Sequence, residues 1–139
     1  MADNYVLITD SAFDILPDKL AEWKVEMIPL GYLFTDTGKE QLDHGEPIRD
    51  FYRSMREGRV AKTSSVNEDS FIRKFTPFLE EGKDILYLAF SSGLSVTCEN
   101  GKKVAAMLQG KYPERKITVI DCLSASAGQG LFVYLAVQA

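Results

Sequence analysis

The sequence has 139 residues, a length that suits one domain, and 45% of them are apolar and 26% charged. The net charge of −4 and the lack of a basic stripe argue against a nucleic-acid-binding protein. No apolar run reaches the roughly 20 residues that span a bilayer, and the polar, acidic start is unlike a signal peptide. We therefore expect a globular domain that works in the cytoplasm.

The chain carries few residues suited to metal or redox chemistry. Cys98 and Cys122 are too few for a disulfide framework, so we expect buried or free thiols in a reducing compartment. His44 is the single histidine, and neither cysteine lies in a metal-ligand spacing. No G-x-S-x-G elbow and no glycine-rich phosphate loop is present. The sequence therefore predicts no metal, no cofactor and no catalytic residue.

Strand-like and helical segments alternate along the first third of the chain. Residues 5–9 form a continuous apolar run typical of a buried parallel strand. A helix is expected to begin after Asp14, which would be its N-cap, and to end near residue 24. Residues 25–34 are predicted as a strand interrupted at a proline and a glycine, and residues 39–42 as a short edge strand.

Two amphipathic helices are expected in the middle of the chain. The first covers residues 47–57 and the second residues 67–81, with a polar loop at 62–66 between them. Ser65 and Asn67 compete as the N-cap of the second helix. Three side chains of that helix are predicted to face inward: Phe71, Phe75 and Phe78.

The last part of the chain continues the alternation. Gly101 lies inside a predicted helix, where it lowers helix propensity, so we expect a close approach to a neighbouring element there. Strands that alternate with helices indicate an α/β domain. We predict a single α/β domain over residues 1–139, with a mostly parallel sheet and helices on both faces. The remaining elements are a strand at 84–90, a helix at about 94–108, a strand at 116–121 and a helix within 124–138.

The final segment is strongly apolar. Residues 131–136 are apolar around nearly the whole circumference of the predicted helix, and no stop signal follows them. A helix of this kind needs cover on more than one side. We therefore expect either a missing partner segment or a symmetric homodimer formed through this helix.

Polar side chains gather where predicted strands end. Ligands of parallel α/β sheets bind beyond the carboxyl ends of the strands, and hydroxyl donors next to a helix N-terminus suit a carboxylate or a phosphate. Such residues also act as simple helix caps and turn formers, so this second interpretation stays open. Four clusters qualify: Thr9-Asp10-Ser11, Ser91-Ser92, Asp121-Cys122 and Thr63-Ser64-Ser65.

Six short segments occur in an order that is found in one known family. One of them, T-S-S-V-N, resembles the family's T-S-Q-P-S loop, and another, S-S-G-L-S-V-T, resembles its S-S-x-L-S-G-T. Together the segments cover the whole chain, which resembles the amino-terminal domain of the DegV family. The segments are Thr9–Pro17, Val25–Leu30, Asp43 with Phe51-Tyr52, Thr63–Asn67, Ser91–Thr97, and Val119–Cys122 with Ser126–Gly130.

The resemblance implies a bacterial lipid carrier rather than an enzyme. DegV proteins bind a long-chain fatty acid between two domains, so the chain would be the amino-terminal half of such a protein. Several members present the fatty acid to a separate fatty-acid kinase. Carried over from the family motifs, Thr63 and Ser95 would bind the head group with Ser64 as a helper, and Ser92 completes the candidate set.

Two departures from the family pattern bear on this site. Val66 replaces a loop proline, which is expected to loosen the turn, and Val96 replaces a glycine, where a side chain would crowd the head group. Two alternative functions therefore stay open. One is a fragment or interaction module that keeps the fold without a complete lipid pocket. The other, which is less favoured, is a serine-dependent transferase that uses the same hydroxyls.

Overall fold

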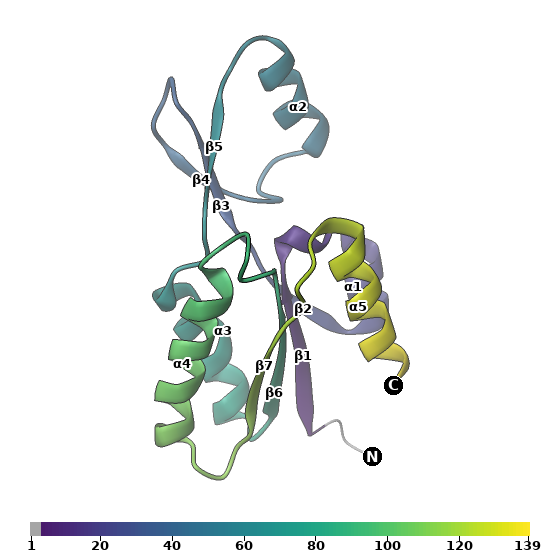
Figure 1. The fold of residues 1–139 in the computed structure, drawn as a ribbon, viewed down its shortest axis with the longest axis vertical. Coiled ribbons are helices and arrows are strands. Elements are labelled where there is room, and N and C mark those ends of the chain that lie inside the picture. The colour runs from purple at the N-terminus through teal and green to yellow at the C-terminus, as the bar shows by residue number, and fades with distance from the viewer. Residues whose placement is uncertain (1–3) are drawn as a thin grey trace.

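A four-stranded parallel sheet forms the centre of the computed structural model, which describes residues 4–139 (Figure 1). Its strands lie in the order β2-β1-β6-β7. Every neighbouring pair is parallel, so each connection crosses over a face of the sheet. The strands are β1 (Tyr5–Asp10), β2 (Val25–Ile28), β6 (Asp84–Ala89) and β7 (Ile117–Asp121).

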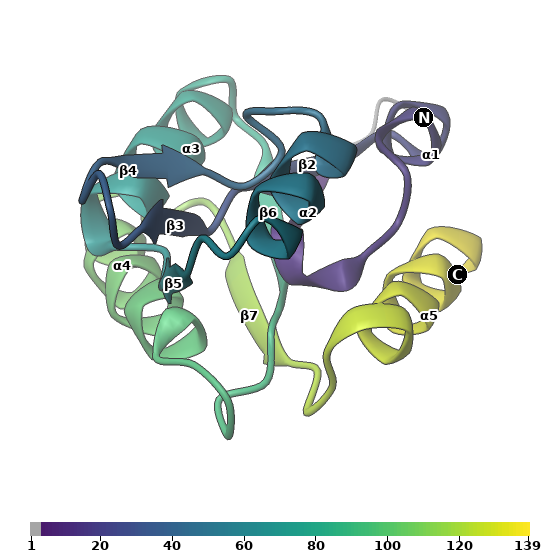
Figure 2. The same cartoon turned by 90° about the horizontal axis from the view of Figure 1, so that it is seen from above.

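Helices cover both faces of this sheet (Figure 2). The predicted α/β class, with a mostly parallel sheet between helices, is thereby confirmed. No helix within residues 4–139 is long and apolar enough to cross a membrane. One face carries α3 (Glu68–Glu80) and α4 (Thr97–Lys111), and the other carries α1 (Pro17–Trp23) and α5 (Ser126–Gln138).

Each face of the sheet has its own apolar core, because successive strand residues point to opposite sides. In β1, Ile8 belongs to the core under α3 and α4, and Leu7 to the core under α1 and α5. The larger core includes Ile8, Phe71, Phe75, Tyr87, Cys98 and Leu108. The smaller one includes Leu7, Phe13, Leu20, Val25, Leu88, Cys122 and Val133.

A second, smaller sheet projects beyond one end of the first (Figure 1). It is antiparallel, with the order β4-β3-β5, and α2 (Ile48–Arg56) packs against it. The packing is aromatic, since the ring centroid of Phe51 lies 5.0 Å from that of Tyr32 and 5.7 Å from that of Phe34. The strands are β3 (Gly31–Phe34), β4 (Glu40–Leu42) and β5 (Ala61–Ser64).

The prediction of a loop at residues 62–66 is wrong for residues 62–64, because residues 61–64 form the strand β5. This strand has no apolar alternation that would reveal it in the sequence. Its pairing with β3 makes it a strand, with Thr63 opposite Tyr32 and Ser64 opposite Gly31. The interruption predicted within residues 25–34 is confirmed, and it separates β2 in the large sheet from β3 in the small one.

Two helices begin later than predicted. Asp14 is not an N-cap, since it has a left-handed conformation after a short 3-10 turn and α1 begins only at Pro17. The turn forms because the carboxylate of Asp10 accepts a hydrogen bond from the N–H of Ala12 at 3.2 Å. The other late helix is α4, which begins at Thr97.

The expectations for α3 are largely confirmed. Asn67, rather than Ser65, is the N-cap, and its side chain accepts a hydrogen bond from the N–H of Ser70 at 2.9 Å. Among the three phenylalanines expected to face inward, Phe71 and Phe75 are fully buried. Phe78 only packs at the edge of the core.

We predict that Gly101→Ala destabilises the fold. A Cβ at Gly101 would lie 2.9 Å from Cε1 of Tyr87 and 3.2 Å from Cζ of Phe71, which confirms the expected close approach. Tyr87 cannot retreat easily, because it is fully buried and its hydroxyl is bonded to Asp10. Overpacking costs about 1–3 kcal/mol, more than the roughly 1 kcal/mol gained by replacing a helical glycine. Thermal unfolding should show a lower Tm.

The matched control is Gly110→Ala in the same helix. No neighbouring atom lies within 4 Å of a Cβ at Gly110, so this variant should keep or raise the Tm. Equal Tm values for both variants would contradict the packing argument.

Candidate functional site

A buried carboxylate organises the edge of the large sheet where its strands end. Asp10, the last residue of β1, is fully buried. Its Oδ2 accepts hydrogen bonds from the hydroxyl of Tyr87 at 2.7 Å and the N–H of Phe90 at 2.8 Å. Its Oδ1 accepts from Nε2 of Gln129 at 3.0 Å and from the N–H of Ala12. The carboxylate therefore joins β1, β6 and α5.

The side chains around Asp10 reinforce this arrangement. Burial, together with the negative charge of Asp10, raises the pKa of Tyr87 well above its ordinary value, so the phenol keeps the proton that it donates. The hydroxyl of Thr9 donates to the carbonyl of Leu88 at 2.9 Å and accepts from Gln129 at 3.2 Å. The cluster predicted at Thr9-Asp10-Ser11 is thus a buried structural network that fixes where the site loops begin.

The loop between β6 and α4 contains a turn that is held together by hydrogen bonds to Ser91. The carbonyl of Ser91 accepts hydrogen bonds from the N–H groups of Leu94 at 3.0 Å and Ser95 at 3.2 Å. The hydroxyl of Ser91 accepts from the N–H of Gly93 at 3.2 Å. Because residues 91–95 are used in this turn, the helix starts three residues later than the apolar pattern predicts.

Ser92 is exposed and lies beside a second carboxylate. Its N–H donates to Oδ1 of Asp121 at 3.2 Å, and the N–H of Leu123 donates to the same oxygen at 3.0 Å. Hydrogen bonding from Ser92 holds the pKa of Asp121 below its usual range, so the carboxylate is charged at neutral pH. A negative charge next to Ser92 makes this serine a poor partner for an anionic head group.

Thr97 connects the loop that carries Ser95 to the loop that follows β5. The hydroxyl oxygens of Ser95 and Thr97 are 2.9 Å apart, and the N–H of Val66 donates to Oγ1 of Thr97 at 3.2 Å. Nδ2 of Asn100 donates to the carbonyl of Val66 at 2.9 Å. A proline at position 66 would lack the N–H that makes the first of these contacts. The expected loosening at Val66 is therefore offset by two hydrogen bonds to α4.

Thr63 and Ser64 lie on opposite faces of the small sheet, because they are consecutive residues of β5. Thr63 is exposed on the face that carries Tyr32. On the other face, the hydroxyl of Ser64 donates to Oε1 of Glu40 at 2.6 Å. Through Thr97, the structure links Ser95 to Val66, two residues after the end of β5, but it does not bring all the predicted hydroxyls to one point.

Val96 fits its backbone position without strain. Its φ of −76° and ψ of −1° lie in the ordinary helical region, so no glycine is required there by conformation. The side chain is 60% exposed and lies next to Ser95 in the sequence.

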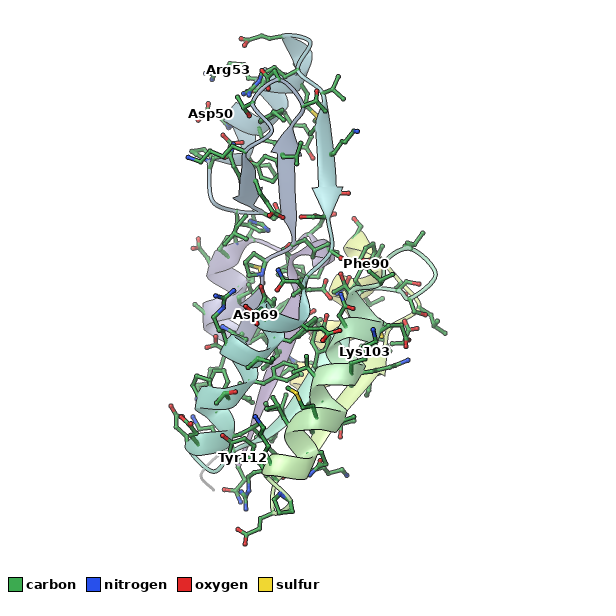
Figure 3. The ribbon with its side chains drawn as sticks, turned by 90° about the vertical axis from the view of Figure 1, so that its left-hand side faces the viewer. Asp50, Arg53, Asp69, Phe90, Lys103 and Tyr112 are labelled. Atoms are coloured by element: carbon green, nitrogen blue, oxygen red, sulfur yellow. The ribbon has the colours of Figure 1, made fainter. Side chains whose placement is uncertain are left out.

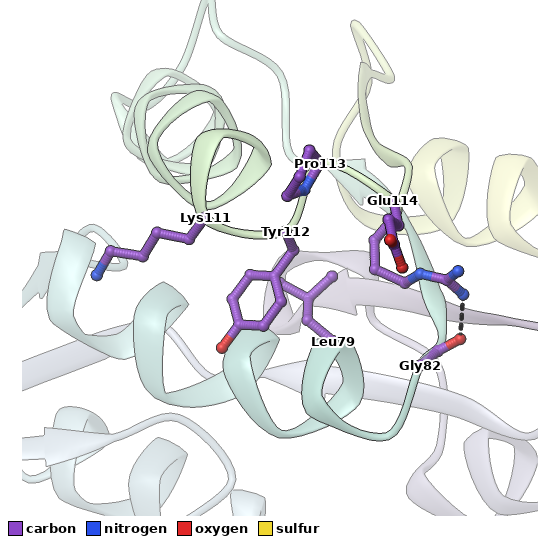
Figure 4. A pocket seen from close by; sticks show the side chains of 7 residues that line it. Leu79, Gly82, Lys111, Tyr112, Pro113 and Glu114 are labelled. Atoms are coloured by element: carbon purple, nitrogen blue, oxygen red, sulfur yellow. Dashed lines mark hydrogen bonds between the residues drawn. The ribbon is translucent and has the colours of Figure 1, made fainter.

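Two cavities on the described part of the surface lie elsewhere. One of about 370 Å³ is lined by Leu79, Gly82 and Tyr112, among others, where β6 and β7 begin (Figure 4). Another, of about 360 Å³, lies between α4 and β7. Phe90 and Tyr112 mark opposite ends of the layer formed by the large sheet and its helices (Figure 3). None of the predicted ligand-binding residues lines either cavity.

The residues suited to catalysis or metal binding do not converge on the site. His44 lies in the turn between β4 and α2, where it contacts the neighbouring Asp43. Burial raises the pKa of Cys122 to about 12 and also raises that of Cys98, so both free thiols stay protonated at neutral pH. Within residues 4–139, no group of three or more His, Cys, Asp or Glu could hold a metal ion.

The fold and the site define a parallel α/β domain with polar loops at the carboxyl ends of its strands. Residues 4–139 match the family described as "Uncharacterised protein, DegV family", and the chain belongs to this family. It is 36% identical over 137 residues to the DegV domain-containing protein CPE0026 of Clostridium perfringens. It is 32% identical over 124 residues to a protein of Thermotoga maritima named "Fatty acid-binding protein".

A solved structure supports the same assignment. The DegV family protein of Thermus thermophilus, described by its fatty acid binding, superimposes with a TM-score of 0.82 at 28% identity and covers 97% of this chain. The chain spans about half the length of the relatives that it matches, with 46% of the Clostridium protein, 41% of the Thermotoga protein and 46% of the Thermus chain.

We predict that Tyr87→Phe lowers stability by about 1.5–3 kcal/mol, the usual contribution of a hydrogen bond to a charged group. The substitution leaves Oδ2 of Asp10 with only the N–H of Phe90 as donor. Urea denaturation measures the free energy of unfolding.

Tyr5→Phe is the control, because this tyrosine is 51% exposed at the other end of β1. It should change the free energy of unfolding by no more than about 0.5 kcal/mol. A Tyr87→Phe variant as stable as this control would show that the Asp10 network contributes little.

Proposed function

We propose that this chain binds a long-chain fatty acid through its carboxylate, with Thr63 and Ser95 as the main head-group residues. The observation that carries the proposal is the junction at Thr97, which links the Ser95 loop to the residues that follow β5. The relative named as a fatty acid-binding protein and the fatty-acid-binding structure from Thermus thermophilus support it.

Hydroxyl chemistry suits this role. The N–H of Thr97 donates to Oγ of Ser95 at 3.1 Å, and a hydroxyl proton rotates to suit its surroundings. When Thr97 donates its own hydroxyl proton to Ser95, the proton of Ser95 becomes free for a carboxylate. The hydroxyl of Thr63 is exposed and forms no hydrogen bond within residues 4–139, so it is free to donate as well.

Apolar side chains for an acyl chain lie at the same edge of the sheet. Leu94 follows β6 and is 68% exposed, and Leu123 follows β7 and is 77% exposed. Each methylene group that a ligand buries contributes roughly 0.8 kcal/mol. Covering such side chains with an acyl chain would supply most of the binding free energy, while the hydroxyls orient the head group.

We infer that the chain is a carrier without catalytic activity of its own. A nucleophilic serine needs a base within reach, and His44 instead contacts Asp43. The carrier would act in the cytoplasm, where its buried free thiols stay reduced, as the amino-terminal half of a two-domain protein. It would present the lipid carboxylate to a separate fatty-acid kinase.

The alternative is an interaction module that keeps the fold without a complete lipid pocket. One observation favours it: none of the predicted hydroxyl residues lines either of the two cavities described above. A transferase that uses the same serines has no comparable support.

Lipid extraction tests the proposal. We predict that the denatured, purified chain releases a long-chain fatty acid, detected by mass spectrometry, and that the Thr63→Ala/Ser95→Ala variant releases none. The control Ser70→Ala/Thr76→Ala removes two hydroxyls from α3 and should carry as much lipid as the unmodified chain. Circular dichroism should show the same fold for all three.

An empty extract from the folded chain would favour the interaction module. Equal lipid in all three proteins would reject Thr63 and Ser95 as head-group residues.

We also propose that the chain forms a homodimer through α5. Leu131 and Leu135 lie one turn apart on this helix and are 59% and 57% exposed, and Tyr134 is 41% exposed. Each leucine that a partner buries contributes roughly 1.5–3 kcal/mol, and a symmetric contact covers both copies. Sedimentation at increasing concentration should show a monomer–dimer equilibrium, which Leu131→Glu/Leu135→Glu abolishes. A monomer at every concentration would contradict this.

A further inference from the structure

The hydroxyl group of Thr97 lies in the interior of the protein, where its proton needs an acceptor. The side chain is fully buried at the start of α4. Among residues 4–139, Oγ1 of Thr97 is hydrogen-bonded to the N–H of Val66 at 3.2 Å and to Oγ of Ser95 at 2.9 Å. An N–H group only donates, so Val66 uses a lone pair of Oγ1 and cannot accept its proton. Oγ of Ser95 is therefore the acceptor that remains for the proton of Thr97.

The reverse direction, in which Ser95 donates to Thr97, is unfavourable. It would leave the hydroxyl proton of Thr97 buried without an acceptor, and an unpaired buried donor costs more free energy than an ordinary hydrogen bond contributes. Ser95 is only half-buried, so its own proton can reach a ligand or water. The different burial of the two hydroxyls thus sets the direction of the hydrogen bond from Thr97 to Ser95.

The acceptor positions of Ser95 are both occupied within the protein. A hydroxyl oxygen has two lone pairs. One accepts the backbone N–H of Thr97 at 3.1 Å, and the other accepts the hydroxyl of Thr97. The backbone N–H of Ser95 is also used, because it donates to the carbonyl of Ser91 at 3.2 Å. The side chain of Ser95 therefore offers a ligand one O–H donor and no acceptor.

Val66 holds Thr97 in this arrangement. The valine is buried, and its N–H and its carbonyl are both bonded to α4, the carbonyl through Nδ2 of Asn100 at 2.9 Å. The N–H fixes Oγ1 of Thr97 beside Ser95 without offering it an acceptor. The hydroxyl of Ser95 is thus oriented by two buried residues, Val66 and Thr97.

We propose that Thr97 is a positioning residue that keeps Ser95 a hydrogen-bond donor, so that the site favours head groups that only accept hydrogen bonds. This inference rests on the proposed function. A carboxylate has acceptor oxygens and no proton, so it matches such a donor. An alcohol head group carries a proton of its own, for which Ser95 has no free lone pair. A fatty acid is therefore preferred to a fatty alcohol of the same chain length.

Thr97→Val tests this role, because valine is similar in shape but has no hydroxyl. Calorimetric titration with decanoate and with decanol compares the two head groups on one chain length. We expect Thr97→Val to lower the affinity for decanoate roughly three- to tenfold, the range of one ordinary hydrogen bond, and to leave that for decanol unchanged. Thr97→Ser keeps the hydroxyl and should keep both affinities. The matched control is Thr118→Val in β7, where the threonine side chain forms no hydrogen bond within the described residues.

The direction of the hydrogen bond can also be measured in the unmodified, ligand-free chain, where no substitution affects folding. In an equal mixture of H₂O and D₂O, a slowly exchanging hydroxyl gives two NMR signals for the carbon that carries it, and a rapidly exchanging one gives a single averaged signal. We expect two signals for Cβ of Thr97 and one for Cβ of Ser95. Two signals for Ser95 would overturn the inference, because its proton would then be held inside the protein.

The outcomes of the titrations separate this inference from the function on which it rests. If Ser95→Ala loses decanoate affinity while Thr97→Val leaves the decanoate-to-decanol ratio unchanged, the inference is wrong and the function stands. An equal loss for both ligands in Thr97→Val also overturns it, since head-group chemistry would not be the cause. If the chain binds neither ligand, or if Thr63→Ala/Ser95→Ala binds decanoate normally, the proposed function itself fails, and the inference fails with it.

Discussion

The arrangement of the whole molecule depends on the carboxylate of Asp10. A buried charge without partners is strongly destabilising, so the chain must deliver donors to this point. The donors come from the turn after β1, from β6 and the residue that follows it, and from α5. Satisfying one carboxylate therefore fixes where β6 ends and where α5 packs. The loops that carry the proposed head-group residues start from positions that this network has already set.

The large sheet and its helices follow from the sequence because their signals are local. Continuous apolar runs mark the parallel strands, and the Asn67 cap marks the start of α3. β5 could not be predicted in this way, since its residues are mostly polar and become a strand only by pairing with Tyr32 and its neighbours about thirty positions earlier. The start of α4 was missed for a related reason, because Ser91 bonds to the N–H groups that would otherwise open the helix.

The candidate site was likewise only partly predictable from the sequence. Its hydroxyl residues are visible as motifs, but their partners are not, because the contacts are distant in sequence. Glu40 lies 24 positions from Ser64, and Thr97 lies 31 positions from Val66. The valine at position 66 shows the difference most clearly. In the sequence this valine stands where the family pattern has a proline, which suggests a looser turn. In the structure its backbone N–H donates a hydrogen bond to Thr97, which a proline could not do.

The position of the small sheet affects the binding free energy of any ligand that contacts both Thr63 and Ser95. Thr63 belongs to the small sheet, whereas Ser95 lies in the loop that follows β6 of the large sheet. Among residues 4–139, hydrogen bonds hold the segments that flank the small sheet to the large one: the N–H of Leu30 donates to Ser11 at 2.9 Å, and Val66 bonds to α4. A head group bonded to both hydroxyls adds a further tie, and part of its binding free energy is spent on restricting the two sheets relative to each other. Ligand affinity and the rigidity of this junction are therefore linked, and a substitution that stiffens the junction strengthens binding from a distance.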